Sequence, residues 1–185
     1  MILSKEDLHF YLKKDKEALG ISRKRPSFFG DEIWKFQIIL RHYEYYINVK
    51  KTKLGGVIKH FWGFLHHRYS IKLGLQIPPN VFEYGLRINH YGLIVVNPEA
   101  RVGKFCDIHQ GVNIGQNVEP GSVPIIGDNC YIGPGVKLFG RIHIGNSIVI
   151  GANSVVNKSF EENDITIAGI PAKKVKDSGD PYKRK

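Results

Sequence analysis

Aliphatic residues recur every six positions between about residues 78 and 161, and this repeat is the main signal in the sequence. Its leading positions are Val102, Ile108, Ile114, Ile126, Ile132, Leu138, Ile144, Ile150 and Val156. A small or apolar residue follows four positions after most of them, for example Cys106 and Val112. A period of six fits neither the helical period nor the two-residue alternation of a strand. It predicts a mainly β fold, a parallel β-helix whose coils have three flat faces.

The segment before the repeat has helical periodicity, with Ile33, Phe36 and Leu40 spaced to lie on one helix face. The sequence predicts three helices there, at residues 4–19, 31–51 and 57–73. The chain is therefore divided into an N-terminal helical region (1–74), a β-helix domain (75–175) and a polar C-terminal tail (176–185).

The repeat is interrupted once, directly after Ile114 and Gly115. Residues 116–124 contain glycine, proline and polar residues where a coil needs aliphatic ones. We expect this segment to leave the coil as a loop. Loops on a rigid scaffold are common places for function.

Charge is distributed unevenly along the chain. The net charge is +10, of which residues 1–83 hold +7 and residues 171–185 hold +4, whereas residues 84–170 hold −1. Nucleic-acid binding proteins combine basic residues with aromatic platforms or a known module, and neither is visible here. We therefore expect no nucleic-acid partner. The basic flanks fit an anionic ligand, a phosphorylated cofactor or a membrane surface.

The two cysteines, Cys106 and Cys130, lie at inward positions of the repeat, which predicts buried thiols in a reducing compartment. No second ligand pair accompanies Cys106 and His109, so no metal is expected.

The charged N-terminus and the lack of a long apolar run predict a cytoplasmic protein. The aromatic residues of the helices predict packing on the coil or on a neighbouring subunit. Peripheral contact with the inner face of a membrane is the alternative.

Three motifs resemble those of the hexapeptide-repeat acyltransferases, in particular the serine-acetyltransferase-like branch. They are Asn89–Asn97 (NHYGLIVVN), Gln110–Gly115 (QGVNIG), and residues 150–156 together with 168–173 (IGANSVV and AGIPAK). The resemblance implies a left-handed β-helix, acetyl-CoA as co-substrate, and a homotrimer with active sites between neighbours. It also implies that His90 is the catalytic histidine.

The chemistry of acetyl transfer agrees with a catalytic His90. Histidine is the side chain best suited to act as a general base near neutral pH. His90 also stands where the repeat would otherwise place an aliphatic residue, as expected of a functional position; a structural histidine is the alternative. His109, about one coil further along, is the rival. Asn89, Glu83 and Asp107 are candidates for supporting the imidazole.

The remaining site residues follow from the resemblance. Backbone amides near Gly115 and Gln116 are candidates to stabilise the oxyanion. Acetyl-CoA is expected along the outside of the coils, at Gly133, Gly151, Ala152, Lys158, Gly169, Ile170, Pro171, Ala172 and Lys173. The lysines either meet its phosphates or are solvated surface charges. No serine or cysteine nucleophile with an adjacent base is visible, so we expect direct transfer.

The acceptor site departs from the pattern of serine acetyltransferases. Those enzymes have an aspartate before the catalytic histidine and an Arg-His pair before the loop proline, and this chain has Asn89, Ser122 and Val123 there. Since serine needs partners for its carboxylate and ammonium, the sequence favours O-acetylation of a sugar or glycan of the capsule, exopolysaccharide or O-antigen type. The alternatives are a serine O-acetyltransferase of cysteine biosynthesis, an N-acetyltransferase of an amino sugar, and a non-catalytic β-helix assembly module.

Overall fold

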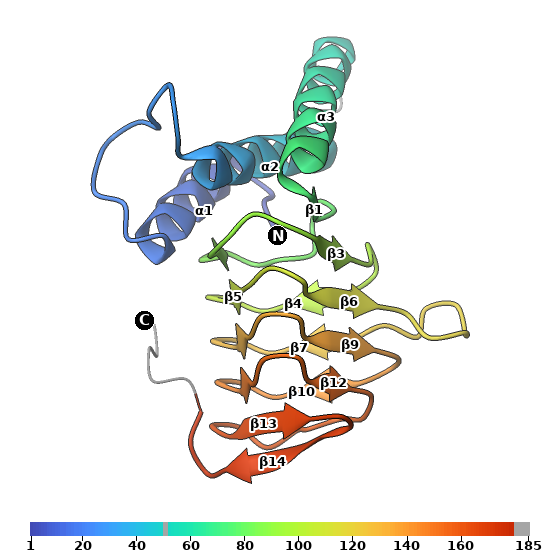
Figure 1. Cartoon of the computed structure of the whole chain (residues 1–185). Coiled ribbons are helices and arrows are strands. Elements are labelled where there is room, and N and C mark those ends of the chain that lie inside the picture. The colour runs from blue at the N-terminus through green and yellow to red at the C-terminus, as the bar shows by residue number, and fades with distance from the viewer. Residues whose placement is uncertain (50–51, 180–185) are drawn as a thin grey trace.

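The computed structural model describes residues 1–49 and 52–179, and it shows three helices on one end of a column of short strands (Figure 1). The helices are α1 (Lys5–Ala18), α2 (Glu32–Asn48) and α3 (Lys53–Leu73). The Ser4 hydroxyl caps α1 by accepting a hydrogen bond from the Asp7 amide. All three predicted helices are present, and the predicted end of the second, near residue 51, lies outside the described residues.

The strands form a left-handed parallel β-helix, which confirms the predicted fold class (Figure 1). Sheet A contains β1 (Leu75–Gln76), β3 (Ile94–Val96), β6 (Asn113–Gly115), β9 (Lys137–Phe139) and β12 (Val155–Val156). Sheet B contains β4 (Arg101–Val102), β7 (Ile125–Ile126) and β10 (His143–Ile144). Sheet C contains β2 (Arg87–Ile88), β5 (Asp107–Ile108), β8 (Tyr131–Ile132), β11 (Val149–Ile150), β13 (Thr166–Gly169) and β14 (Ala172–Lys176).

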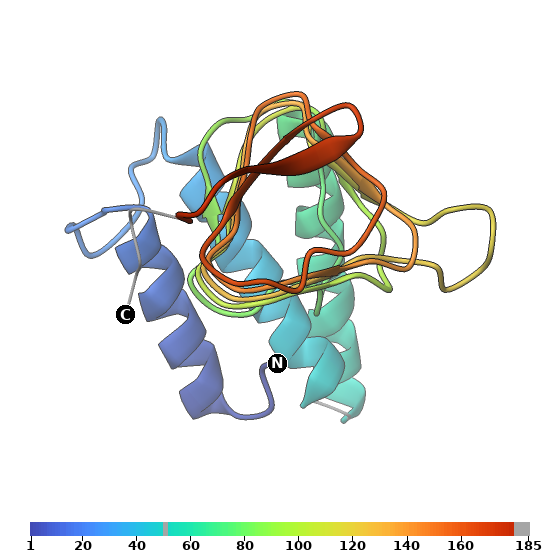
Figure 2. The same cartoon turned by 90° about the horizontal axis from the view of Figure 1, so that it is seen from below.

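The three sheets meet at three edges, and Figure 2 shows the resulting triangular outline. We name them the A–B, B–C and C–A edges, after the sheets that each turn connects in chain order. Strand pairing is parallel throughout the coil, and only β14 runs antiparallel, against β13. This hairpin closes the C-terminal end, so the chain does not leave the coil as a single last strand. Residues 180–185 of the predicted tail lie outside the described residues.

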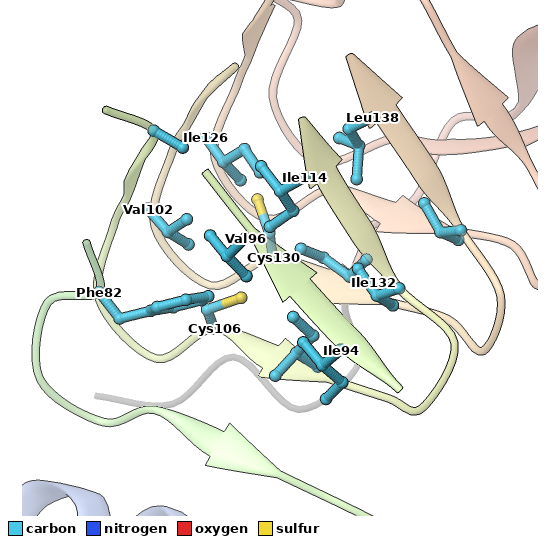
Figure 3. Close-up of a cluster of buried hydrophobic side chains, with 14 of the residues drawn as sticks. Phe82, Ile94, Val96, Val102, Cys106, Ile114, Ile126, Cys130, Ile132 and Leu138 are labelled. Carbon is cyan, nitrogen blue, oxygen red and sulfur yellow. The ribbon is translucent and has the colours of Figure 1, made fainter. Parts of the chain in front are cut away.

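The aliphatic residues of the repeat point inward and stack from coil to coil (Figure 3). Ile108 and Ile132 are partners in sheet C, and Ile114 and Leu138 are partners in sheet A; all four are fully buried. Cys106 and Cys130 are also fully buried, as predicted. Each buried aliphatic side chain contributes about 1.5–3 kcal/mol of transfer free energy, so the repeat supplies a continuous core.

A buried ion network joins the helical region to the coil. The fully buried guanidinium of Arg41 in α2 binds the carboxylate of Asp15 in α1 at 2.7 Å and that of Glu44 at 2.9 Å. It also donates to the main-chain carbonyls of Phe82 and Glu83, which belong to the first coil. Buried charges are tolerated when they are paired and fully hydrogen-bonded, as these are. The network fixes the helices relative to the start of the coil.

Candidate functional site

The C–A edge combines an exposed histidine with narrow turns. Its turns are residues 89–93, 109–112, 133–136 and 151–154, between the strands of sheets C and A. His90 is exposed in the first turn. Hydrogen bonds stack the turns on each other, from the Gly111 amide to the Leu93 carbonyl at 2.7 Å and from the Gly135 amide to the Gln110 carbonyl at 2.9 Å. The last two turns, at residues 133–136 and 151–154, consist mainly of small residues, and a ligand can approach the backbone where Ala152 is exposed.

The Asn89 side chain links His109 to the buried carboxylate of Asp107. Its amide nitrogen donates to Asp107 Oδ1 and lies 3.2 Å from His109 Nε2. Asp107 Oδ2 accepts a second hydrogen bond, from Arg87 Nη1 at 3.1 Å. A carboxamide nitrogen has two hydrogens, so Asn89 can serve both acceptors at once. An aspartate at position 89 would place a second carboxylate against Asp107 and remove this donor.

His109 therefore has a defined tautomer and orientation. Because Asn89 donates to Nε2, the neutral ring holds its proton on Nδ1. Burial lowers the pKa of His109 below its usual value, against the opposing effect of Asp107. The rings of His109 and His90 have centroids 6.0 Å apart. Of the support candidates, Asn89, Asp107 and His109 thus lie together next to His90, and Asp107 contacts His109 rather than His90.

Glu83 lies elsewhere in the fold and is not the carboxylate that orients His90. Its Oε1 binds the N-terminal ammonium of Met1 at 2.8 Å, and its Oε2 accepts a hydrogen bond from the Tyr11 hydroxyl. Burial alone raises the pKa of Glu83, but these hydrogen bonds outweigh burial and lower it. The prediction failed because the repeat shows that Glu83 points outward but not that the N-terminus folds back onto it.

The predicted oxyanion residues are at a different edge from His90. His90 precedes β3, whereas Gly115 ends the parallel neighbouring strand β6. Gly115 and Gln116 therefore lie at the A–B edge, on the far side of sheet A. The loop that begins at Gln116 projects outward from this edge, as predicted (Figure 2). One protomer does not bring these amides to its own His90.

The predicted cofactor residues are divided between the two edges. Gly133, Gly151 and Ala152 are in the turns of the C–A edge, where Ala152 is exposed. Gly169, Ile170 and Pro171 form the exposed turn between β13 and β14 at the same edge.

The other three cofactor candidates, Lys158, Lys173 and Ala172, lie outside these turns. Lys158 follows β12 at the A–B edge, where its ammonium lies 5.4 Å from the Phe160 ring centroid. Lys173 is exposed on β14. The side chain of Ala172 is turned into the core and is 1% exposed, so it cannot contact a ligand.

A hollow of about 270 Å³ lies between the helical region and Asn89. From the coil it is lined by Ile88, Asn89 and Tyr91, and from the helical region by residues that include Asp31 and Glu32. A hydrogen bond from the Ser27 amide and the ion pair with Arg23 lower the pKa of Asp31. Both carboxylates on the helical side of the hollow are thus ion-paired, Asp31 with Arg23 and Glu32 with Lys35 and Lys72.

A larger hollow, of about 690 Å³, lies between α3 and the start of sheet A, and His90 does not line it. Within residues 1–49 and 52–179 no three potential metal-ligating side chains form a cluster.

Three residues around Asn89 and His109 were not identified from the sequence: Arg87, Tyr131 and Asp31. Arg87 stands two positions before Asn89 on β2, so both side chains point outward from sheet C. Tyr131 packs its ring 4.9 Å from that of His109. Aligning the coils by their repeat would have placed Arg87, Asp107 and Tyr131 in one column. Asp31 gave no sequence signal, because its position depends on how α2 packs on the coil.

Comparison with known proteins gives consistent matches. No protein-family model matches the chain. A serine acetyltransferase of Staphylococcus xylosus is 32% identical over 178 residues, which are 95% of this chain and 77% of that protein. A serine acetyltransferase of Synechococcus elongatus is 34% identical over 118 residues, 62% of this chain and 48% of that protein, so this match spans about half of the relative. The structure of a serine acetyltransferase from Brucella abortus in complex with coenzyme A has a TM-score of 0.74 at 26% identity, covering 95% of this chain and 70% of that chain.

These matches contradict the expectation of a sugar or glycan acceptor. The relative from Staphylococcus xylosus aligns along nearly the whole chain and is named for serine. The expectation rested on Ser122 and Val123, which replace a cationic pair. That inference assumed that only this loop can bind the acceptor's charged groups, and the structure shows charged side chains on other elements around Asn89.

Proposed function

Because this chain belongs to the serine acetyltransferase family of hexapeptide-repeat enzymes, we propose that it transfers the acetyl group of acetyl-CoA to the hydroxyl of serine. The observation that carries the proposal is the C–A edge, where an exposed His90 stands at one end of a column of narrow turns.

His90 is the proposed general base. Its imidazole accepts the proton of the serine hydroxyl while the oxygen attacks the thioester carbonyl. The tetrahedral intermediate then collapses, the carbon–sulfur bond breaks, and the coenzyme A thiolate takes the proton from the imidazolium. His109 supports this step by remaining neutral, because a second imidazolium 6.0 Å away would oppose the charge that develops on His90.

The C–A edge also provides the binding surface for acetyl-CoA. The pantetheine arm is an extended chain of amides, and the backbone is open to such a chain at the exposed Ala152 and the half-buried Gly151, whereas Gly133 is buried beneath the next turn. The exposed turn at Gly169, Ile170 and Pro171 continues this surface to the end of the coil. Lys173 is the proposed partner of the cofactor phosphates, because it is exposed on the adjacent strand β14.

The division of the site between two edges favours a homotrimer. The proposed oxyanion donors at Gly115 and Gln116 lie across sheet A from His90 of the same protomer. In a ring of protomers the A–B edge of one chain meets the C–A edge of the next. The projecting loop, residues 116–124, then closes the neighbour's site, and the site is incomplete in a monomer.

Serine recognition requires an anionic and a cationic partner, and we assign both near Asn89. Asp31 in the hollow beside Asn89 is the proposed partner of the serine ammonium. Arg87 is the proposed partner of the serine carboxylate, since it is one-third exposed and gives Asp107 only one of its five N–H donors. Arg87 thus takes the role of the cationic loop pair that this chain lacks.

The test is to incubate purified protein with acetyl-CoA and L-serine, and to follow the free thiol of coenzyme A together with the mass of acetylated serine. The expected result is thiol release that depends on serine and matches the acetylserine formed. Release that does not depend on serine, or that depends equally on a non-amino alcohol, contradicts the proposed acceptor. Failure to bind acetyl-CoA at all favours the assembly-module alternative.

A substitution separates acceptor binding from catalysis. Arg87→Gln removes the proposed charge-assisted hydrogen bond to the serine carboxylate. It should raise the KM for serine about tenfold or more and change the KM for acetyl-CoA little. Lys104→Gln, at the B–C edge, is the matched control. An equal effect of both substitutions would remove Arg87 from the acceptor site.

A further inference from the structure

Helix α3 packs on the protein along only part of its surface. Of its 21 residues, only Gly55 and Leu73 are buried. Five large apolar side chains are instead exposed: Leu54, Val57, Phe61, Phe64 and Ile71, each between 55% and 71%. Their separations of three, four, three and seven residues place them on one side of the helix. We call these five residues the α3 stripe.

The charges of α3 all have the same sign. The helix contains Lys53, Lys59, Arg68 and Lys72, and no aspartate or glutamate. Arg68 follows Phe64 by four residues and precedes Ile71 by three, so it lies within the stripe. The exposed side of α3 is therefore both apolar and basic.

A second exposed apolar feature is in the loop between α1 and α2. Phe28 and Phe29 are 86% and 85% exposed, with their ring centroids 4.9 Å apart. The basic residues Arg23, Lys24 and Arg25 precede them in the same loop. Figure 1 shows that this loop and α3 both rise at the end of the molecule opposite β14. Two separate segments at this end, the loop on the left of Figure 1 and α3 on the right, are thus each apolar and basic.

We propose that this end of the molecule binds the surface of an anionic phospholipid bilayer. An amphipathic helix with basic and aromatic residues lies in the interfacial region of a membrane with its apolar side toward the acyl chains. Basic residues near that surface are attracted by the negative potential of anionic lipids. The helices within the described part of the chain are too short or too polar to cross a bilayer, so the contact is peripheral.

A second copy of α3 fits this surface less well. The spacing of the stripe resembles the seam of a helix pair, in which apolar residues alternate at three and four positions. Pairing two copies of α3 would bring Lys53 and Arg68 of both helices together without any acidic residue of α3 to balance them, whereas Lys72 is already paired with Glu32 of α2. Such a pairing would also leave Phe28 and Phe29 unexplained. The surface of an anionic bilayer accounts for the exposed apolar and basic residues of both α3 and the loop that contains Phe28 and Phe29.

The test is sedimentation of the full chain with vesicles of phosphatidylcholine mixed with phosphatidylglycerol, compared with vesicles of phosphatidylcholine alone. The expected result is binding to the anionic vesicles that weakens as salt is raised, because salt screens the attraction. The double variant Phe61→Gln/Phe64→Gln and the single variant Arg68→Glu should each lose about tenfold or more in vesicle affinity. Val175→Gln, on β14 at the other end of the molecule, is the matched control with an equally exposed side chain.

Several outcomes would overturn the proposal. These are equal binding to neutral and anionic vesicles, no binding to either, or the same loss of affinity in the Val175 variant. Light scattering on the same samples tests the alternative that the α3 stripe is a protein interface. That alternative predicts that Phe61→Gln/Phe64→Gln halves the particle mass and that wild type does not bind vesicles. None of these outcomes depends on the acceptor, so the serine assay and the vesicle assay can fail separately.

Discussion

The B–C and C–A edges are built from the same six-residue repeat but use their turns differently. At the B–C edge, side-chain oxygens bind the next turn: Asp128 Oδ1 accepts from the Lys104 amide at 2.8 Å, and Asn146 Oδ1 accepts from the Asp128 amide at 2.8 Å. Asn163 continues this ladder to the Asn146 amide at 2.7 Å. At the C–A edge the last two turns, at residues 133–136 and 151–154, consist mainly of small residues, and the first turn exposes His90. The comparison shows that a side-chain ladder follows the turns of the B–C edge, whereas the C–A edge exposes an imidazole and the backbone near Ala152.

The two edges therefore predict opposite results for substitution. A change at the B–C edge should lower stability and leave catalysis unchanged. A change at the C–A edge should lower activity and leave stability unchanged, since its exposed side chains take little part in packing.

The largest expected effect is that of His90→Ala. Loss of a general base typically lowers kcat by about 10²–10⁴, while the temperature of unfolding should stay the same because His90 is exposed. The matched control is His143→Ala, an exposed histidine on sheet B. Thiol release and thermal unfolding are measured on both variants. Similar activities of the two would show that His90 is not the base.

The next effect is on cofactor binding. Ala152→Trp puts a bulky side chain on the exposed turn where the pantetheine is proposed to lie, and it should raise the KM for acetyl-CoA about tenfold or more. Because Ala152 is exposed, the variant should unfold at the wild-type temperature. Lys104→Trp, in an exposed turn of the B–C edge, is the control. An unchanged KM in the Ala152 variant would move the cofactor away from the C–A edge.

A smaller effect, on the free energy of unfolding, is expected at the B–C edge. Asn146→Ala removes the side-chain acceptor of the Asp128 amide, and one such hydrogen bond contributes about 1 kcal/mol. The free energy of unfolding should fall by about this amount while kcat and KM stay at wild-type values. Urea denaturation and the thiol assay measure the two quantities. A loss of activity without a loss of stability would remove the distinction between the edges.

The sequence predicted the coil because each position of the repeat has a single physical role. An inward position accepts only a small or aliphatic residue, so Cys106 and Ile108 could be assigned to the core. His90 was proposed partly because the six-residue count places it where an aliphatic residue is expected. The strand pairing gives that inward position to Ile88, the partner of Ile108, and His90 lies in the turn after it, so its catalytic role stays a prediction.

The sequence could not predict what depends on contacts between distant segments. Asp15 and Arg41 are 26 residues apart, and only their shared contact with the first coil explains why they are buried. Glu83 was misplaced for the same reason, since its contacts with Met1 and Tyr11 join residues far apart in the sequence. The position of Lys158 could have been predicted from the sequence, since counting turns from β12 places it at the A–B edge.

The smallest expected effect concerns Glu83, which begins the first turn of the B–C edge and is bound by the N-terminal ammonium. Because these contacts hold its pKa below the usual value of 4.5, Glu83 stabilises the fold above that pH. The contribution is lost as the pH falls through the lower pKa of the folded state. Glu83 is half-exposed, so Glu83→Gln should cost only a few tenths of a kcal/mol at neutral pH.

This effect is measured as the difference in unfolding free energy between wild type and Glu83→Gln as a function of pH. The difference should be constant near neutral pH and shrink as the solution becomes more acidic than pH 4.5. Glu119→Gln, in the exposed loop, is the control and should show no such dependence. A difference that grows in acid would mean that the folded state raises the pKa of Glu83, and the contacts with Met1 and Tyr11 would then not stabilise the first turn of the B–C edge.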